Sequence, residues 1–442
     1  MRVKIKIMKT LHFIKLPLLS LFFLIFIETS VSASTQTFFQ KDSIEYKQYN
    51  GIVTDGETGK ILVFAALSIA HTNISTITNK EGEFSLKVPI KRISDANIII
   101  SFLGYKKKTI AIAELKEDKN KITLEPTTTV LSEVNIKLPN DAKTLVTEVF
   151  DKKKDNYYNQ QALMTSFYRE TIKKRRKNVS LAEAIVTIYK QPYSSFKKDY
   201  IKLHRSRKKT DYTKLDTLAL KLQGGPYNPL YLDLMKYPEY MFSPEVINLY
   251  TFSFAPSTTI GSQPVYVVSF KQRKDVKEPL YYGKLFIDSN SLALVSAAYN
   301  LNVENKKLTS KIFVKRKPKD VFLYPTLASY RVDYREKEGK WYYGYSNVKL
   351  TFKVVRKGKW FNSTYSLSSE MAITDWVAMA SKERLKSKDR LKKSVIISDE
   401  ASGFSDAEFW GSYNVIEPEK SIESAIKKIK RQLKKIAKEG NS

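Results

Sequence analysis

The stretch GIVTDGETGKILVFAALSIA, residues 51–70, decides the fold of the first domain. Ile52 and Val53 form one apolar segment and residues 61–69 form another, with the turn-forming residues 55–59 between them. Gly59 suits a turn position with positive φ, because glycine has no Cβ to clash there. This pattern predicts two short strands joined by a tight turn.

Short apolar runs separated by turns continue to about residue 124. Residues 79–82 form a second turn, and beyond it Phe84, Leu86 and Val88 alternate with polar residues. Further apolar runs lie at 98–102, 110–112 and 122–124. Strands at this spacing, with no helix between them, predict a β-sandwich. We expect Phe84, Leu86 and Phe102 to fill the space between its two sheets.

Several motifs of this region occur in a set order. They are Gly51-Ile52-Val53, Asp55, Thr58-Gly59, Ala65, Thr78, Gly82, Phe84, Leu86, Phe102-Leu103-Gly104-Tyr105 and Leu131-Ser132-Glu133-Val134. With them, residues 50–136 resemble the carboxypeptidase-regulatory-like domain, a transthyretin-type sandwich common in exported proteins of the Bacteroidota. Val63 stands where that family often has proline, and Asn73-Ile74 where it favours a glycine turn. The resemblance implies structural roles for these residues and no peptidase activity.

The first 33 residues have the parts of a secretory signal peptide. A basic start with five Lys or Arg precedes an apolar run at 16–27, and Val31 and Ala33 stand where a signal peptidase reads small residues. We expect residues 1–33 to be cleaved and 34–49 to be a flexible segment. The protein is then exported to the periplasm, the outer membrane or the medium, without a transmembrane span. An uncleaved membrane anchor is the alternative.

Composition narrows the chemistry and the partners. The absence of cysteine excludes disulfides, thiolate metal sites, cysteine nucleophiles and a lipid-modified cysteine. The net charge is +31, of which the leader carries four, leaving +27. Such a charge attracts polyanions. For an exported protein we expect lipopolysaccharide, phospholipid or acidic glycan, or another envelope protein, rather than nucleic acid. A solvated surface in a lysine-rich organism explains the charge equally well.

The rest of the chain, 137–442, predicts a larger α+β domain, so the fold class is mainly β with some α. Asp141 can cap a helix that begins the domain, and 222–262 reads as a long irregular connection. Predicted strands at 265–270, 281–288, 294–301, 308–314, 329–334, 343–354 and 363–373 make a curved antiparallel meander over about 265–375. An amphipathic C-terminal helix is expected at about 419–438, docked on the protein's own sheet, with Phe409-Trp410 anchoring its approach.

No catalytic, cofactor-binding or metal-binding motif is present. His71 and His204 fall in different domains and lack the spacing of zinc ligands. If a catalytic acid exists, Glu170 and Glu183 are the best candidates, although ion pairs with nearby lysines are the stronger expectation. We therefore predict no enzyme, no catalytic residues and no cofactor or metal.

Two surface features have both a binding and a structural interpretation. Trp341, Tyr343 and Tyr345 follow a period of two, so they fall on one strand face and form either a sugar-stacking platform or an aromatic ladder. The basic runs 173–177 and 205–209 are either a site for an anionic head group or solvated loops.

Three functions remain open at this point. The leading one is a non-enzymatic cell-envelope protein that binds a ligand or partner, and its second sheet resembles in pattern the half-barrels of lipoprotein carriers. The second is an outer-membrane β-barrel-associated protein, which the charged strand faces and the basic C-terminus oppose. The third is a glycan or peptide hydrolase that uses a carboxylate pair.

Overall fold

The computed structural model describes residues 45–127, 141–175, 177–210, 222–314, 317, 319–358, 362–379, 385–401 and 409–420. Residues Ile44–Ser442 make up one structural unit. The expected signal peptide lies outside the described residues, as does the expected C-terminal helix beyond residue 420. Of the segment 34–49, which we expected to be flexible, residues 46–49 belong to a strand, so that part of the prediction is wrong.

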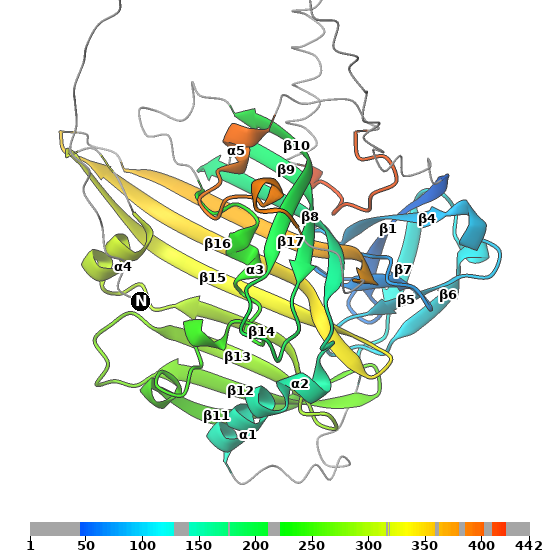
Figure 1. Ribbon diagram of the computed structural model, residues 1–442, viewed down its shortest axis with the longest axis horizontal. Coiled ribbons are helices and arrows are strands. Elements are labelled where there is room, and N and C mark those ends of the chain that lie inside the picture. The colour runs from blue at the N-terminus through cyan, green and yellow to red at the C-terminus, as the bar shows by residue number, and fades with distance from the viewer. Residues whose placement is uncertain are drawn as a thin grey trace, which may run out of the picture. The chain divides into compact units, whose positions relative to one another are not determined.

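Two small sheets form the N-terminal domain, in agreement with the predicted sandwich (Figure 1). One sheet contains β4 (Glu83–Pro89), β1 (Tyr46–Asp55) and β7 (Asn120–Leu124), and the other contains β3 (Ser75–Ile77), β2 (Ala66–Ile69), β5 (Asn97–Ser101) and β6 (Lys108–Ala111). The 3-10 helices η1 (Ile90–Arg92) and η2 (Ile112–Glu114) connect strands. Val53, Leu67, Phe84 and Ile100 belong to one buried core that draws on both sheets.

Asp55 explains the first turn of this domain. Its Oδ1 accepts the backbone N–H groups of Glu57 and Thr58 at 2.8 and 3.0 Å, and its Oδ2 accepts the Tyr105 hydroxyl at 2.7 Å. Gly59 then takes the expected positive φ of 67°. The aspartate that sets this turn therefore also binds Tyr105, which lies between β5 and β6.

The two predicted core phenylalanines differ in burial. Phe84 is fully buried, as expected. Phe102 is half-buried and packs against the edge of the core, with its ring centroid 5.4 Å from that of Tyr105. Phe84 is therefore the fully buried phenylalanine of this core, which also contains the buried Tyr49.

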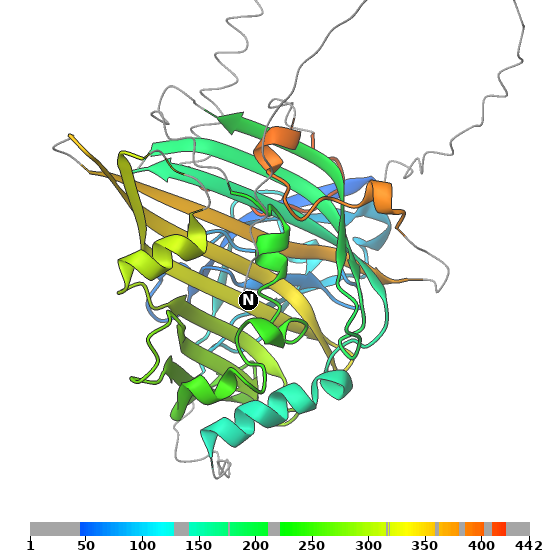
Figure 2. The same cartoon turned by 60° about the vertical axis from the view of Figure 1, so that its left-hand side comes forward.

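Ten antiparallel strands form the large sheet of the second domain, which curves as Figure 2 shows. Its order is β10-β9-β8-β17-β16-β15-β14-β13-β12-β11. The strands are β8 (Ala162–Lys174), β9 (Lys177–Lys190), β10 (Tyr200–Thr210), β11 (Tyr250–Ile260), β12 (Gln263–Gln272), β13 (Tyr281–Asp288), β14 (Leu294–Leu301), β15 (Val321–Lys337), β16 (Lys340–Arg356) and β17 (Ser363–Ala378). The last strand, β17, joins two meanders that otherwise do not pair.

Helices and an irregular segment cover one face of this sheet, which we call the front face; the opposite face is the back face. The helices of the domain are α1 (Ala142–Asp151), α2 (Lys153–Asn156), α3 (Tyr227–Leu230), η4 (Pro238–Tyr240), η5 (Ile247–Leu249), α4 (Lys306–Phe313), η6 (Ser387–Asp389) and α5 (Ile397–Glu400). Asp141 caps α1 as predicted, since its side chain accepts the Thr144 N–H. Apolar residues of α1, of α3 and of residues 232–250 share one buried core with the sheet, so the described front face is packed.

Two predictions for this domain are wrong. Residues 308–314 form most of helix α4 instead of a strand, because Asn305 caps it by accepting the Leu308 N–H at 3.1 Å. The supposed irregular connection 222–262 contains strand β11, the edge of the sheet. The region after residue 162 forms the long strands β8 and β9.

A β-bulge also changes which face the aromatic residues of β16 occupy. Tyr334 pairs with Tyr343 and Asp333 pairs with Tyr345, so Gly344 has no partner residue. Trp341 and Tyr343 therefore join the front-face core, whereas Tyr345 joins a cluster on the back face. The predicted arrangement of all three rings on one face is therefore wrong. All three rings are also buried, so they offer no platform for a sugar.

Candidate functional site

The two acids singled out from the sequence do not form a pair. Arg169 on β8 is directly opposite Glu183 on β9, and Glu170 is opposite Ala182. Because side chains alternate between the faces of a sheet, Glu170 points to the front face and Glu183 to the back face. A hydrolase that uses two carboxylates needs both beside one bond, so Glu170 and Glu183 cannot serve together.

Glu183 is the centre of a buried ion-pair network on the back face. Its Oε1 lies 2.7 Å from Arg169 Nε, and its Oε2 lies 2.7 Å from Arg207 Nη2. Arg169 Nη1 also approaches Glu370 at 3.4 Å. Burial would raise the pKa of Glu183, but the two guanidinium groups outweigh that effect and lower it. The carboxylate is thus held ionised in a structural ion pair, whose cations are arginines and not the expected lysines.

This network holds the C-terminal segment 409–420 against the sheet. Arg169 Nη2 donates to the Ile416 carbonyl at 2.7 Å. Trp410 is buried, with Arg207 stacked 4.7 Å from its ring centroid and Phe167 edge-on at 5.7 Å. Trp410 is thus buried on the back face, while the helix whose approach it was expected to anchor lies outside the described residues.

The sandwich packs on the same face through its edge strand β3. Ser75 donates to the Ile373 carbonyl at 3.1 Å, next to a bulge in β17. Asn73 donates to the Trp376 carbonyl at 2.5 Å and accepts Lys337 Nζ at 2.7 Å. Asn73 stands where the resembling family favours a glycine turn, so this departure supplies contacts with the second domain.

A second charged cluster is buried on the front face and was not found from the sequence. Lys190 Nζ lies 2.9 Å from Asp199 Oδ2 and 2.5 Å from Asp233 Oδ2. All three side chains are at most 2% exposed. Burial would lower the pKa of Lys190, but the two carboxylates outweigh it and raise the pKa above its usual value.

Tyrosines enclose this Lys190 cluster. Tyr334 and Tyr193 donate to Asp233 at 2.9 and 3.1 Å, and Tyr237 donates to Asp199 at 2.8 Å. The cluster joins β9, the loop after it and the covering segment that holds Asp233. Its carboxylates are satisfied by internal donors, so its chemistry is that of a buried structural network.

Glu170 has no such counter-charge among its described contacts. It is buried, accepts the Tyr168 hydroxyl at 2.6 Å and receives a backbone hydrogen bond from Ser398. Burial raises its pKa to about 7, with the charge of Asp399 adding to the effect. Glu170 is therefore a buried acid that changes charge near neutral pH.

This pKa makes stability depend on pH. A carboxyl group whose pKa is higher in the folded than in the unfolded state loses stability as the pH rises between the two values. We expect the free energy of unfolding to contain a penalty from Glu170 that grows between about pH 4.5 and pH 7, to roughly 3 kcal/mol. Glu170→Gln should remove that penalty, and urea denaturation at pH 5 and pH 8 measures it.

The exposed Glu148 on α1 supplies the control for this experiment. The Glu148→Gln variant should have the same free energy of unfolding as the unmodified protein at both pH values. Parallel pH dependence of the Glu170→Gln variant and the unmodified protein would contradict the assignment.

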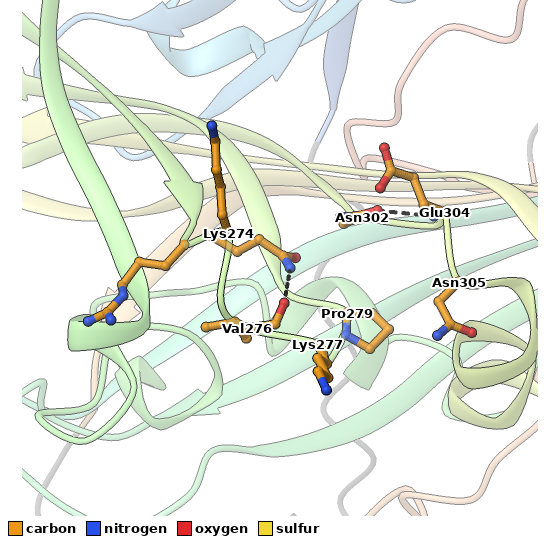
Figure 3. Close-up of a pocket in the computed structure, with 9 residues that line it drawn as sticks. Lys274, Val276, Lys277, Pro279, Asn302, Glu304 and Asn305 are labelled. Atoms are coloured by element: carbon orange, nitrogen blue, oxygen red, sulfur yellow. Dashed lines mark hydrogen bonds between the residues drawn. The ribbon is translucent and has the colours of Figure 1, made fainter.

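A polar pocket of about 350 Å³ lies at the end of β12 and β14 (Figure 3). It is lined by Gln272, Arg273, Lys274, Val276, Lys277, Pro279, Asn302, Glu304 and Asn305. Arg273 pairs with Asp275 at 2.8 Å, and Gln272 donates to the Val276 carbonyl at 3.0 Å. Figure 3 shows Lys274 and Lys277 extending in opposite directions from the loop. Amides and cations thus border a space in the size range of small ligand sites.

The two basic runs that the sequence offered as binding sites, 173–177 and 205–209, contact other parts of the protein. The run 205–209 donates to Phe409 through Arg205 and to Ser398 through Lys208, besides the Arg207 ion pair. In the run 173–177, Lys173 Nζ lies 3.8 Å from Glu419. Because the run 205–209 lies in β10 and Arg207 is buried, the expectation of a solvated loop is wrong for this run, and its contacts are structural.

The described part of the chain contains two histidines, and neither belongs to a cluster of metal ligands. His204 Nε2 lies 2.7 Å from Thr187 Oγ1 on β9, and His71 occupies the turn after β2 with a φ of 57°. No group of three acids or histidines within the described ranges could hold a metal ion. Likewise, no helix among these residues is sufficiently long and apolar to span a bilayer.

Comparisons with solved structures give distant likenesses. A DUF1329 family protein from Desulfovibrio piger is 9% identical with a TM-score of 0.24, over 55% of this chain and 96% of that one. A LolA superfamily protein from Nitrosomonas europaea is 8% identical with a TM-score of 0.21, over 58% and 100%. Lipovitellin is 8% identical with a TM-score of 0.25, over 53% and 27%. At these values the likenesses carry no inference about ligand or activity.

Sequence comparisons are informative for the first domain. A search of curated protein sequences finds no match. The family model of the CarboxypepD_reg-like domain matches residues 49–136. The motifs quoted for 50–136 and the observed two-sheet sandwich agree with that match. Residues 49–136 are therefore a CarboxypepD_reg-like domain.

Proposed function

We propose that this protein is an exported, non-enzymatic binding protein of the cell envelope. The contacts of its buried acids support this proposal most directly. Glu183, Asp199 and Asp233 are each paired with a buried cation, and Glu170 faces away from Glu183. The pocket in Figure 3 has only one lining acid, Glu304. These acids of the described part of the chain stabilise the fold, and none of the four is placed beside another as a catalytic acid and base.

The ligand class follows from charge. Outside the leader the chain keeps a net charge of +27, which attracts anionic envelope components. The pocket adds Arg273, Lys274 and Lys277 beside the side-chain amides of Asn302 and Asn305. Amides bind hydroxyl groups and cations bind carboxylate or phosphate groups. We propose an acidic glycan or the sugar-phosphate part of lipopolysaccharide as the ligand.

Paired lysine substitutions test this site. Lys274→Gln with Lys277→Gln is expected to weaken binding of the purified protein to soluble polygalacturonate about tenfold, because two charge-assisted contacts are lost at roughly 0.7 kcal/mol each. Affinity electrophoresis with neutral dextran as the reference polymer measures the effect.

A matched control removes the same charge elsewhere. Lys284→Gln with Lys349→Gln changes two exposed lysines of β13 and β16 that do not line the pocket. Equal losses in the two double variants would mean that the whole surface, and not the pocket, attracts the polymer. Failure of the unmodified protein to bind polygalacturonate or lipopolysaccharide micelles would overturn the ligand class.

A further inference from the structure

The loop between β9 and β10, residues 191–199, presents a phenylalanine to solvent. The Phe196 side chain is 102% exposed, whereas Ile312 and Val377, the next among the exposed large apolar residues described, reach 55%. An aromatic ring in water is unfavourable compared with one in an apolar environment. Single exposed apolar residues are common on protein surfaces, but this ring is fully exposed at a loop tip and adjoins two exposed lysines, and this combination points to a partner that buries it.

Contacts at the base of the loop hold its shape. Lys236 Nζ donates to the carbonyl groups of Pro192 and Ser195 at 2.7 and 2.6 Å. Burial lowers the pKa of Lys236 to about 8, so its ammonium group stays largely protonated at neutral pH. Ser194 N–H donates to Asn159 Oδ1 at 3.0 Å. The loop is thus built to keep Phe196 away from the protein core.

The ends of the loop are fixed as well. Asp199 accepts the Gln191 N–H at 2.7 Å and belongs to the buried Lys190 cluster. Tyr193 donates to Asp233 in that cluster. Because both ends are tied into the core, ordering the loop on binding costs little conformational entropy.

The surroundings of Phe196 are basic and amphipathic. Lys197 and Lys198 follow it directly, and both are exposed. Tyr240 on η4 is 37% exposed, and its ring is 6.1 Å from that of Tyr237, which bonds Asp199 at the loop base. An apolar tip followed by two lysines matches the chemistry of a membrane interface.

We propose that the loop 191–199 anchors the protein to a bilayer containing anionic lipid. Phe196 enters the interface between head groups and acyl chains, and Lys197 and Lys198 stay with the lipid phosphates. A protein partner fits less well, because a single ring beside two strongly hydrated ammonium groups offers little of the apolar area that a specific interface needs.

This anchor is separate from the proposed ligand pocket. The loop follows the end of β9 that pairs with the start of β8, whereas the pocket lies where β12 ends and β13 begins. The strand registers place these positions at opposite ends of the sheet. The two proposals therefore succeed or fail independently.

Co-sedimentation with vesicles tests the anchor. The purified protein is mixed with vesicles of phosphatidylcholine containing roughly 30 mol% phosphatidylglycerol, and with pure phosphatidylcholine vesicles. We expect Phe196→Ala to lower partitioning into the anionic vesicles about 20-fold, since the ring supplies the apolar term. Lys197→Gln with Lys198→Gln should lower it roughly 20-fold on anionic vesicles and leave the weak binding to neutral ones unchanged.

Two further variants make the result specific. Phe322→Ala removes a ring that is 43% exposed at the opposite end of the sheet, on β15, and should bind vesicles like the unmodified protein. Phe196→Trp should retain binding and shift its fluorescence to the blue when anionic vesicles are added. In a protein that also carries Lys274→Gln and Lys277→Gln, Phe196→Ala should lower vesicle binding by the same factor as in the unmodified protein.

Three results would overturn the proposal. They are failure of the unmodified protein to sediment with anionic vesicles, equal sedimentation of Phe196→Ala, and an unshifted spectrum for bound Phe196→Trp. Equal sedimentation of Phe196→Ala would point to a protein surface as the partner of the loop.

Discussion

Replacing Lys190 with alanine is expected to lower the free energy of unfolding by about 3 to 5 kcal/mol. The substitution leaves the carboxylates of Asp199 and Asp233 buried without a cation, while Tyr193 and Tyr237 still hold them in place. The cost of a buried, unpaired charge exceeds the value of an ordinary hydrogen bond several-fold. Urea denaturation followed by intrinsic fluorescence measures the loss.

The expected structural consequence is local release of the covering segment that includes Asp233. Backbone hydrogen exchange over residues 222–249 should increase, because Lys190 is the cation that ties Asp233 to β9. Lys349→Ala, at an exposed site on β16, should change the free energy of unfolding by no more than about 0.5 kcal/mol. A Lys190→Ala variant as stable as this control would mean that the cluster does not hold the front face together.

The second large effect is expected from Glu183→Ala on the back face. This change leaves Arg169 and Arg207 buried side by side, and we expect a loss of about 3 to 5 kcal/mol in the free energy of unfolding. Arg169 also donates to the Ile416 carbonyl, so hydrogen exchange in residues 409–420 should rise before the sheet itself opens. Thermal denaturation and exchange on the same sample test both points.

Glu278→Ala supplies the control for charge, because Glu278 is exposed in the loop after β12. It should leave both the melting temperature and the exchange of residues 409–420 unchanged. If Glu183→Ala destabilises the protein while residues 409–420 stay protected, the C-terminal segment is held by Trp410 and not by the ion pairs.

The fold could be predicted from the sequence in segments where turn residues flank short runs of alternating apolar and polar residues. Strands β13 and β14 have the same bounds as predicted, and the sandwich follows from its turns at Asp55 and Gly82. The prediction failed where a cap or a bulge outweighs periodicity. Asn305 caps a helix that covers most of a segment predicted as a strand, and Gly344 shifts Tyr345 to the other face. A single capping residue or bulge hardly changes the hydrophobic periodicity when that periodicity is averaged over about ten residues.

The buried clusters were harder to anticipate because their members are distant in sequence. Lys190 is 9 residues from Asp199 and 43 from Asp233, and Tyr334 is 101 residues from Asp233. The sequence did contain one signal, since Ala184, Val186, Ile188 and Lys190 share a phase on an apolar strand. A lysine in the buried phase indicates a buried acid somewhere, but its identity depends on the tertiary fold. Glu170 and Glu183 could have been assigned to opposite faces only after β8 and β9 were recognised as paired strands.

The position of β17 has a consequence for the order in which the molecule assembles. Strands β8–β10 and β11–β16 are two meanders that become one sheet only when β17 pairs with β8 on one side and β16 on the other. Until residues 363–378 are available, both meanders have an open edge, which is a template for wrong pairing. Contacts such as that between Ser75 and Ile373, 298 residues apart, form later still and slow folding through their loop-closure entropy. A newly synthesised chain therefore passes through a stage with two unfinished sheets, and holding chaperones are most useful to it in that interval.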